Sequence, residues 1–119
     1  MSEFSQSRLE SRIMEAISSM IVSGQIKNPH LSVFTSVTRV ELAPDNTSAR
    51  IYVSSVPENR IDPSVRALNS ARGFIQHRLA AALRTKNTPV LEFCRDDSYR
   101  EADRINRLID EAMKETEER

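Results

Sequence analysis

Apolar residues recur at three- and four-residue steps near the start of the chain, which is the spacing of one face of an α-helix. Between positions 5 and 23 this stripe consists of Leu9, Ile13, Ala16, Ile17, Met20 and Ile21. Gly24 follows directly, and glycine is the residue that most often ends a helix. The pattern therefore predicts a helix over residues 5–23.

Two segments rich in β-branched and aromatic residues come next, over residues 31–42 and 48–56. The second alternates between apolar and polar positions, and its apolar positions are Ala49, Ile51 and Val53. The residues between them, Ala-Pro-Asp-Asn-Thr at 43–47, have the composition of a tight turn. The two segments predict a β-hairpin with one covered face and one solvated face.

The second half of the chain predicts a helix, a short strand and a final helix. Asp62 and Pro63 suit the N-cap and the first position of a helical region that reaches residue 84. A short apolar run over residues 90–94 is expected to join the hairpin. Ser98 and Glu101 have the spacing of a capping box, and the helix after them carries an apolar stripe of Ala102, Ile105, Leu108, Ile109, Ala112 and Met113.

This element order predicts an α+β fold, with helices packed on one face of a three-stranded sheet. The long connection before the third strand allows that strand to run parallel to a neighbour. With 119 residues, the chain is expected to form a single domain over 1–119. The charged residues 114–119 are expected to fray.

The region 63–84 does not fit one straight amphipathic helix. Its apolar stripe includes Leu68, Ile75 and Leu79, but Arg72 falls inside that stripe. Burying an unpaired guanidinium is very costly, and Gly73 follows at once, so we predict a break at residues 71–73 that turns Arg72 outward. The alternative is a straight helix in which Gly73 allows close packing and Arg72 reaches water by extending its side chain.

Charge is distributed unevenly along a chain whose net charge is zero. Residues 60–88 carry six Lys or Arg against Asp62 alone, a net charge of +5, whereas residues 89–119 carry six against ten, a net charge of −4. Such a basic segment is typical of a nucleic-acid footprint. Ordinary solvated helix surface would also account for it.

The sequence resembles the ribosome-binding factor A family in several motifs that occur in the family's order. They are the run Ala67–Ile75 around Arg72 and Gly73, the strand Ala49–Ser54, the strand Pro89–Phe93, and the segments Asp96–Ser98 and Arg104–Ile105. The resemblance departs from the family pattern at Gln76, where arginine is usual, and at His30 and Val90.

The resemblance implies a KH type II fold in which an Ala-x-Gly kink replaces the usual Gly-x-x-Gly loop. It also implies a non-catalytic, RNA-binding role in ribosome biogenesis. Members bind the free small (30S) ribosomal subunit and assist late maturation and processing of 16S rRNA near its terminal region, often in connection with growth in the cold. We accordingly expect a cytoplasmic monomer whose partner is the small subunit and its rRNA, with no membrane and no small-molecule substrate.

The expected RNA contacts are the kink, the basic side chains near it, and Tyr52 as a surface on which a base could stack. The full set is Arg50, Tyr52, Arg66, Ala71, Arg72, Gly73, His77, Arg78, Arg84 and Lys86. One cysteine and two histidines give no zinc spacing, so neither a metal nor a cofactor is expected. An enzyme is disfavoured because no phosphate loop and no nucleophile with a base partner are present. A protein–protein interaction module without RNA binding remains the alternative.

Overall fold

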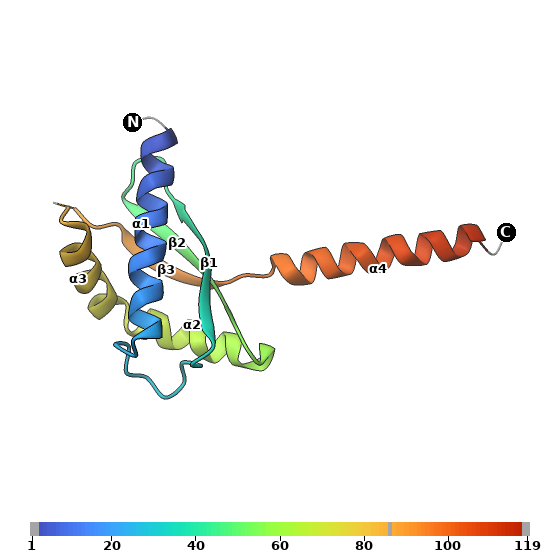
Figure 1. Ribbon diagram of the computed structural model, residues 1–119, viewed down its shortest axis with the longest axis horizontal. Coiled ribbons are helices and arrows are strands. Elements are labelled where there is room, and N and C mark those ends of the chain that lie inside the picture. The colour runs from blue at the N-terminus through green and yellow to red at the C-terminus, as the bar shows by residue number, and fades with distance from the viewer. Residues whose placement is uncertain (1–2, 86, 118–119) are drawn as a thin grey trace.

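The structure, a computed structural model, describes residues 3–85 and 87–117. Its helices and strands follow the predicted order, with one added 3-10 turn (Figure 1). In chain order they are α1 (Glu3–Val22), β1 (Thr35–Leu42), β2 (Ser48–Ser55), η1 (Glu58–Arg60), α2 (Ile61–Ser70), α3 (Arg72–Leu83), β3 (Val90–Arg95) and α4 (Ser98–Glu117). The sheet order is β1-β2-β3, with β1 antiparallel and β3 parallel to β2. The predicted α+β fold and the parallel third strand are confirmed.

The core lies between one face of the sheet and three helices. The inward positions predicted for β2, Ala49, Ile51 and Val53, are all buried. They pack in one cluster with Ile13 and Ile17 of α1, Leu68 of α2, and Ile75 and Leu79 of α3. The opposite face of the sheet, which carries Arg50 and Tyr52, is left open to solvent, as alternation along the strand requires.

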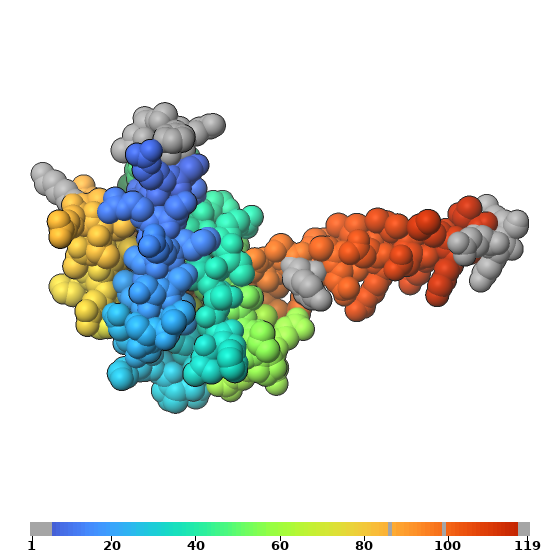
Figure 2. Space-filling view, viewed as in Figure 1, coloured from blue at the N-terminus to red at the C-terminus, as the bar shows by residue number. Residues whose placement is uncertain are grey.

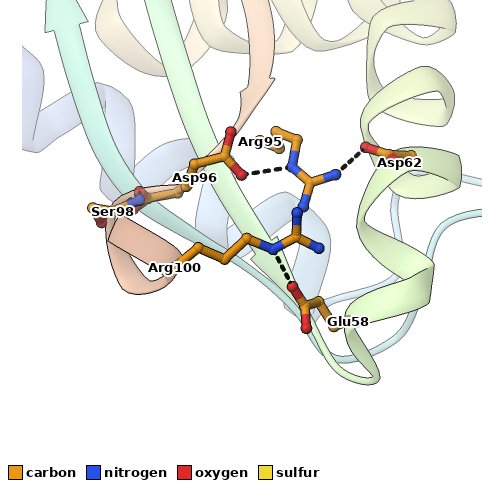
Figure 3. A network of polar contacts seen from close by, with 7 residues as sticks. Glu58, Asp62, Arg95, Asp96, Ser98 and Arg100 are labelled. Atoms are coloured by element: carbon orange, nitrogen blue, oxygen red, sulfur yellow. Dashed lines mark hydrogen bonds and ion pairs between the residues drawn. The ribbon is translucent and has the colours of Figure 1, made fainter. Parts of the chain in front are cut away.

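Helix α4 does not pack on the sheet, and for this helix the sequence prediction is wrong. It extends away from the body of the molecule (Figures 1 and 2), and every residue from 104 to 116 is exposed. Polar contacts hold its first turn in this direction: Arg100 forms an ion pair with Glu58 of η1 (Figure 3). Ser98 forms no capping box, because its hydroxyl donates to Asp96 instead.

Three element starts differ from the sequence prediction, and the first is that of α1, which begins at Glu3 rather than at residue 5. β1 begins at Thr35 rather than at residue 31, because Ser32 and Thr35 make side-chain hydrogen bonds: the Ser32 N–H donates to Ser64 Oγ, and Thr35 Oγ1 donates to the Ser32 carbonyl. α2 begins at Ile61, one residue before Asp62, so Asp62 lies in the first turn and is not the N-cap. Within the described residues, no helix is long and apolar enough to cross a membrane.

The fraying expected for residues 114–119 stays a prediction. Residues 114–117 belong to α4, and residues 118–119 lie outside the described part of the chain.

Candidate nucleic-acid interface

The predicted break in the central helix is present. α2 ends at Ser70, α3 begins at Arg72, and Ala71 between them has φ −91° and ψ 9°, outside the helical region. The Ala71 N–H still bonds back to the carbonyls of Ala67 and Leu68, so the chain turns within a single residue. The straight-helix alternative is excluded.

The sequence indicated that Gly73 either takes part in the break or allows close helix packing. In the fold it does neither. It lies in the first turn of α3, and a Cβ built on it would meet no atom within 4 Å. The break is made at Ala71, and no backbone approaches Gly73 from inside the protein. Glycine costs a helix about 1 kcal/mol relative to alanine, and no contact among the described residues offsets that cost.

Side chains from both sides of the break close the outer edge of β3. The N–H and carbonyl of Phe93 bond to Asn69 Oδ1 (2.9 Å) and Nδ2 (3.0 Å) at the end of α2. The carbonyl of Leu91 accepts from Arg72 Nη1 (3.3 Å), and its N–H donates to Gln76 Oε1 (3.0 Å). We call Asn69, Arg72 and Gln76 the edge strap, because they occupy the backbone groups that a fourth strand would use.

The edge strap explains two features of the sequence. Arg72 would fall inside the apolar stripe if the helix were straight. In the structure its guanidinium reaches the edge of β3, while the residue as a whole stays exposed. Gln76 stands where the family pattern has arginine, and only glutamine supplies the acceptor that the Leu91 N–H requires. The outward turn of Arg72 is therefore confirmed, but its guanidinium already has one protein partner.

The outer face of α3 presents four neighbouring exposed residues: Gly73, Phe74, His77 and Arg78. Phe74 is 41% exposed, and the Arg78 guanidinium lies 5.4 Å from the centroid of its ring. Sequence reasoning missed Phe74. An exposed aromatic residue beside a cation is a surface on which a nucleic-acid base can stack.

The other predicted contact residues divide into two groups. Arg66 on α2 and Arg84 after α3 are exposed on the helical side, and Lys86 lies outside the described residues. Arg50 and Tyr52 lie on the open face of the sheet, where Arg39 stacks 4.1 Å from the Tyr52 centroid. The structure therefore does not bring all ten residues into one patch.

One hollow, of about 330 Å³, lies at the start of β3 and is lined both by residues of the sheet and by Arg72 of α3. Both Arg50 and Arg72 line it, but so do Glu41 and Glu92. The hydrogen bond to Tyr52, together with the nearby Glu92 carboxylate, raises the pKa of Arg50. Two arginines against two carboxylates leave no excess positive charge here, so the hollow is a poorer anion site than the helical face.

Uncompensated positive charge lies on the helical side. The ion pairs formed between described residues use Arg39, Arg95, Arg100, Arg104 and Arg107. Arg66, Arg78 and Arg84 take part in none of them. Their charges are therefore available to an external anion.

Replacing Arg84 with glycine is expected to separate binding from stability. Arg84 ends α3 in the left-handed region, with φ 55° and ψ 36°, a conformation that costs a side-chain-bearing residue about 1 kcal/mol. Arg84→Gly should therefore raise the free energy of unfolding by up to about 1 kcal/mol while weakening RNA binding, as measured by urea denaturation and filter binding. Arg84→Ala is the matched control, because it removes the charge and keeps the strain. Equal RNA affinity in wild type and both variants would show that Arg84 is not a contact.

A second polar cluster, which we call the base cluster, fixes the start of α4 (Figure 3). Arg95 at the end of β3 pairs with Asp62 of α2 and with Asp97, both at 2.8 Å. Asp96 accepts hydrogen bonds from the Ser98 N–H and hydroxyl and from Thr38, which lies at a bulge in β1. The bonds from Ser98, then that from Thr38, lower the pKa of Asp96 below its ordinary value.

Acid is expected to weaken the base cluster. A carboxylate whose pKa is lowered by folding contributes stability above its unfolded pKa, about 3.9, and that contribution is lost as the pH falls through the folded value. Urea unfolding followed by circular dichroism should show stability falling below about pH 4, and Asp96→Asn should flatten this dependence. Asp110→Asn, a control on the far half of α4, should keep it. An unchanged pH dependence in Asp96→Asn would contradict the assignment.

The element order, the parallel β2–β3 pair and the helix break after Ser70 define an α+β fold of the KH type II kind. The model of the family described as ribosome-binding factor A matches residues 5–109. A ribosome-binding factor A from Borreliella burgdorferi (strain ZS7) is 38% identical over 104 residues, which are 87% of each chain. The chain belongs to the ribosome-binding factor A family.

A crystal structure and a model fitted into a cryo-EM map agree with this assignment. The crystal structure of ribosome-binding factor A from Thermus thermophilus matches with a TM-score of 0.66 at 27% identity, covering 75% of this chain and 92% of that one. A Thermus thermophilus ribosome-binding factor A homology model, fitted into a cryo-EM map of a 30S–RbfA complex, matches with a TM-score of 0.64 at 27% identity. It covers 76% of this chain and 93% of that one.

Proposed function

We propose that this protein is a non-catalytic assembly factor that binds the free small (30S) ribosomal subunit in the cytoplasm. It assists late maturation and processing of 16S rRNA near the terminal region. Membership of the ribosome-binding factor A family is the observation that carries this proposal. A structural neighbour fitted into a 30S complex supports the choice of partner.

The start of α3 is the proposed point of RNA contact. This helix begins without a side-chain cap and without an acidic residue in its first turn, so its free N–H groups and its dipole favour an anion there. Arg72 and Arg78 lie beside this end, and Gly73 leaves it without a protruding side chain. A phosphate group of the RNA backbone fits these features, and Phe74 offers a surface for an adjacent base.

Recognition by phosphate contacts explains how the chain can bind RNA without a Gly-x-x-Gly loop. Arg66, Arg78 and Arg84 are distributed over α2 and α3, so they can follow a folded RNA surface rather than clamp a single strand. Such an interface binds one RNA conformation more tightly than others. The protein therefore shifts the equilibrium between RNA conformations by the difference between its affinities for them. This effect on RNA folding should matter most in the cold, where misfolded RNA rearranges slowly.

Gly73→Val tests the proposed contact. The valine side chain meets no atom of the protein near its Cβ, so the fold should survive. A backbone approaching from outside would be pushed away, and we expect about tenfold weaker association. Ser70→Val, at an exposed position at the end of α2, is the matched control and should bind as the wild type does.

Sucrose-gradient sedimentation with purified small subunits and with joined ribosomes measures this association. The wild type should travel with free small subunits and be sparse on joined ribosomes. Binding to protein-free 16S rRNA precursor distinguishes an RNA-binding factor from a protein–protein module, which would bind only the assembled subunit. Normal 16S rRNA ends at low temperature in cells lacking the protein would refute the maturation role.

A further inference from the structure

The apolar stripe of α4 is uncovered along its length. Four of its residues are between 48% and 60% exposed: Ile105, Leu108, Ile109 and Met113. The helix extends into solvent (Figure 2), and an isolated helix of 20 residues is marginal in water. Because an amphipathic helix gains most of its stability when its apolar face is covered, these features indicate that a partner covers the stripe.

The stripe is continuous with an apolar hollow at the base of the helix. Ala102 of α4 lines this hollow together with Val56 and Ile61, and its volume is about 790 Å³. At about 100° per residue, Ile109 and Met113 lie within roughly 20° of Ala102 around the helix axis. The stripe and the hollow therefore face the same side, and one elongated partner can contact both.

Acidic residues border the stripe on both sides. At about 100° per residue, Asp103 and Asp110 lie about 100–120° from Ile109 around the helix axis. On the other side, Glu101 and Glu115 lie about 80–120° from it. We call these four residues the acidic edges. The basic residues of the helix lie farther round, about 140–180° from Ile109; they are Arg100, Arg104, Arg107 and Lys114.

The distal part of the acidic edges is not neutralised within the chain. The two proximal members form ion pairs with arginines of the same helix, at 3.5 Å and 2.9 Å. Asp110 and Glu115 form no ion pair with any described residue. Residues 108–117 have one lysine against four acidic residues, a net charge of −3. A partner of this part of the stripe therefore meets negative charge on both sides of Ile109 and Met113.

These charges indicate which partner fits. RNA would be repelled, because its phosphates have the same sign as the acidic edges. A second copy of α4 would set acidic edges beside acidic edges, in the positions whose charges decide pairing between helices. The free chain is therefore expected to stay a single copy, as the sequence led us to expect. An apolar protein groove bordered by lysines and arginines matches both the stripe and its edges.

We propose that α4 docks, through its stripe and acidic edges, into such a basic-rimmed groove on a protein of the small subunit. This choice of partner rests on the proposed function, and RNA-binding proteins carry basic surfaces of this kind. An amphipathic helix laid into an apolar groove is a recurrent mode of recognition. The chain then contacts RNA through α2 and α3 and protein through α4. The family model ends at residue 109, so the acidic distal half of α4 lies beyond the matched region.

Binding of the full chain to purified small subunits, measured by pelleting the subunits, tests the apolar contact. Ile109→Ala keeps the helix-forming tendency of α4 and should weaken subunit binding by about tenfold. The same variant should bind protein-free 16S rRNA precursor as the wild type does, because the RNA contacts lie on α2 and α3. Val33→Ala is the matched control, because Val33 is 85% exposed in the loop before β1, and it should bind both as the wild type does.

Two charge reversals test the acidic edges. Glu115→Lys changes an edge, whereas Glu111→Lys makes the same change about 160° from Ile109, on the opposite side of the helix. We expect Glu115→Lys to weaken subunit binding by about fivefold and Glu111→Lys to leave it unchanged. Tighter subunit binding by Glu115→Lys would mean that α4 faces RNA, and it would overturn the proposal.

A photo-crosslinking residue in place of Met113 identifies what touches the stripe. With purified small subunits it should attach to a lysine- and arginine-rich segment of a subunit protein, and attachment to 16S rRNA alone would overturn the proposal. If the wild type binds small subunits and Ile109→Ala binds them equally well, this inference fails while the proposed function stands. A wild type that binds neither small subunits nor 16S rRNA precursor would overturn both.

Discussion

Asn69→Ala is expected to lower the free energy of unfolding by about 2–3 kcal/mol, although Asn69 is only partly buried. Its side chain bonds both backbone groups of Phe93, a residue that is only 2% exposed. Leaving a buried polar group without a partner costs about 1–3 kcal/mol, and two groups are affected here. The better helix propensity of alanine offsets up to about 0.7 kcal/mol of this. Urea denaturation followed by circular dichroism measures the difference.

Two further variants show whether the edge strap is the cause. Asn69→Asp can still accept from the Phe93 N–H but cannot donate to its carbonyl, so its effect should be intermediate at neutral pH. Ser70→Ala changes an exposed neighbour and should alter stability by less than about 0.5 kcal/mol. If Asn69→Ala also changed the free energy of unfolding by less than about 0.5 kcal/mol, water would have replaced the Asn69 side chain at the edge of β3.

Replacing Arg66, Arg78 and Arg84 together by glutamine is expected to cause the largest loss of RNA affinity. None of the three forms an ion pair with another described residue, so their loss leaves the fold nearly unchanged. Each phosphate contact contributes about 0.7–0.9 to the slope of log affinity against log salt. The slope should therefore fall by about 2–3, and affinity at moderate salt should drop by roughly 10- to 100-fold. Filter binding to 16S rRNA precursor at several salt concentrations measures both quantities.

A second triple variant controls for net charge. Arg39→Gln, Arg104→Gln and Arg107→Gln remove the same charge from the open sheet face and from α4. This variant should keep most of the affinity and of the salt slope. Equal losses in the two triple variants would mean that overall charge, rather than the surface of α2 and α3, determines binding.

The sequence predicted those features that depend on periodicity. The stripes of α1 and β2 identified the residues that form the core, and the mismatch of Arg72 with a straight helix located the break at Ala71. These predictions succeeded because each depends on the spacing of side chains along one element. The charge excess of residues 60–88 likewise identified the side of the molecule where unpaired arginines lie.

Features that depend on contacts between distant segments were missed. The bonds of Asn69 and Gln76 to β3 join residues 15 to 24 positions apart, and nothing in the local pattern indicates them. Arg50 and Tyr52 were grouped with the kink by residue type, yet strand alternation directs them to the opposite face of the sheet. The stripe of α4 predicted a helix packed on the sheet, and this was wrong, because nothing in the stripe indicates that the base cluster directs the helix away from the sheet.

Helix α4 is held at one end only, so a small tilt at its first turn moves its far end over a large distance. Its 20 residues span about 30 Å, whereas the pairs of Arg95 and Arg100 hold only its first turn. A tilt of about 10° at the base would therefore sweep the far end through an arc of about 5 Å. Because these pairs are partly solvent-exposed, added salt weakens them. Raising the ionic strength should therefore widen the arc over which the far end of α4 moves.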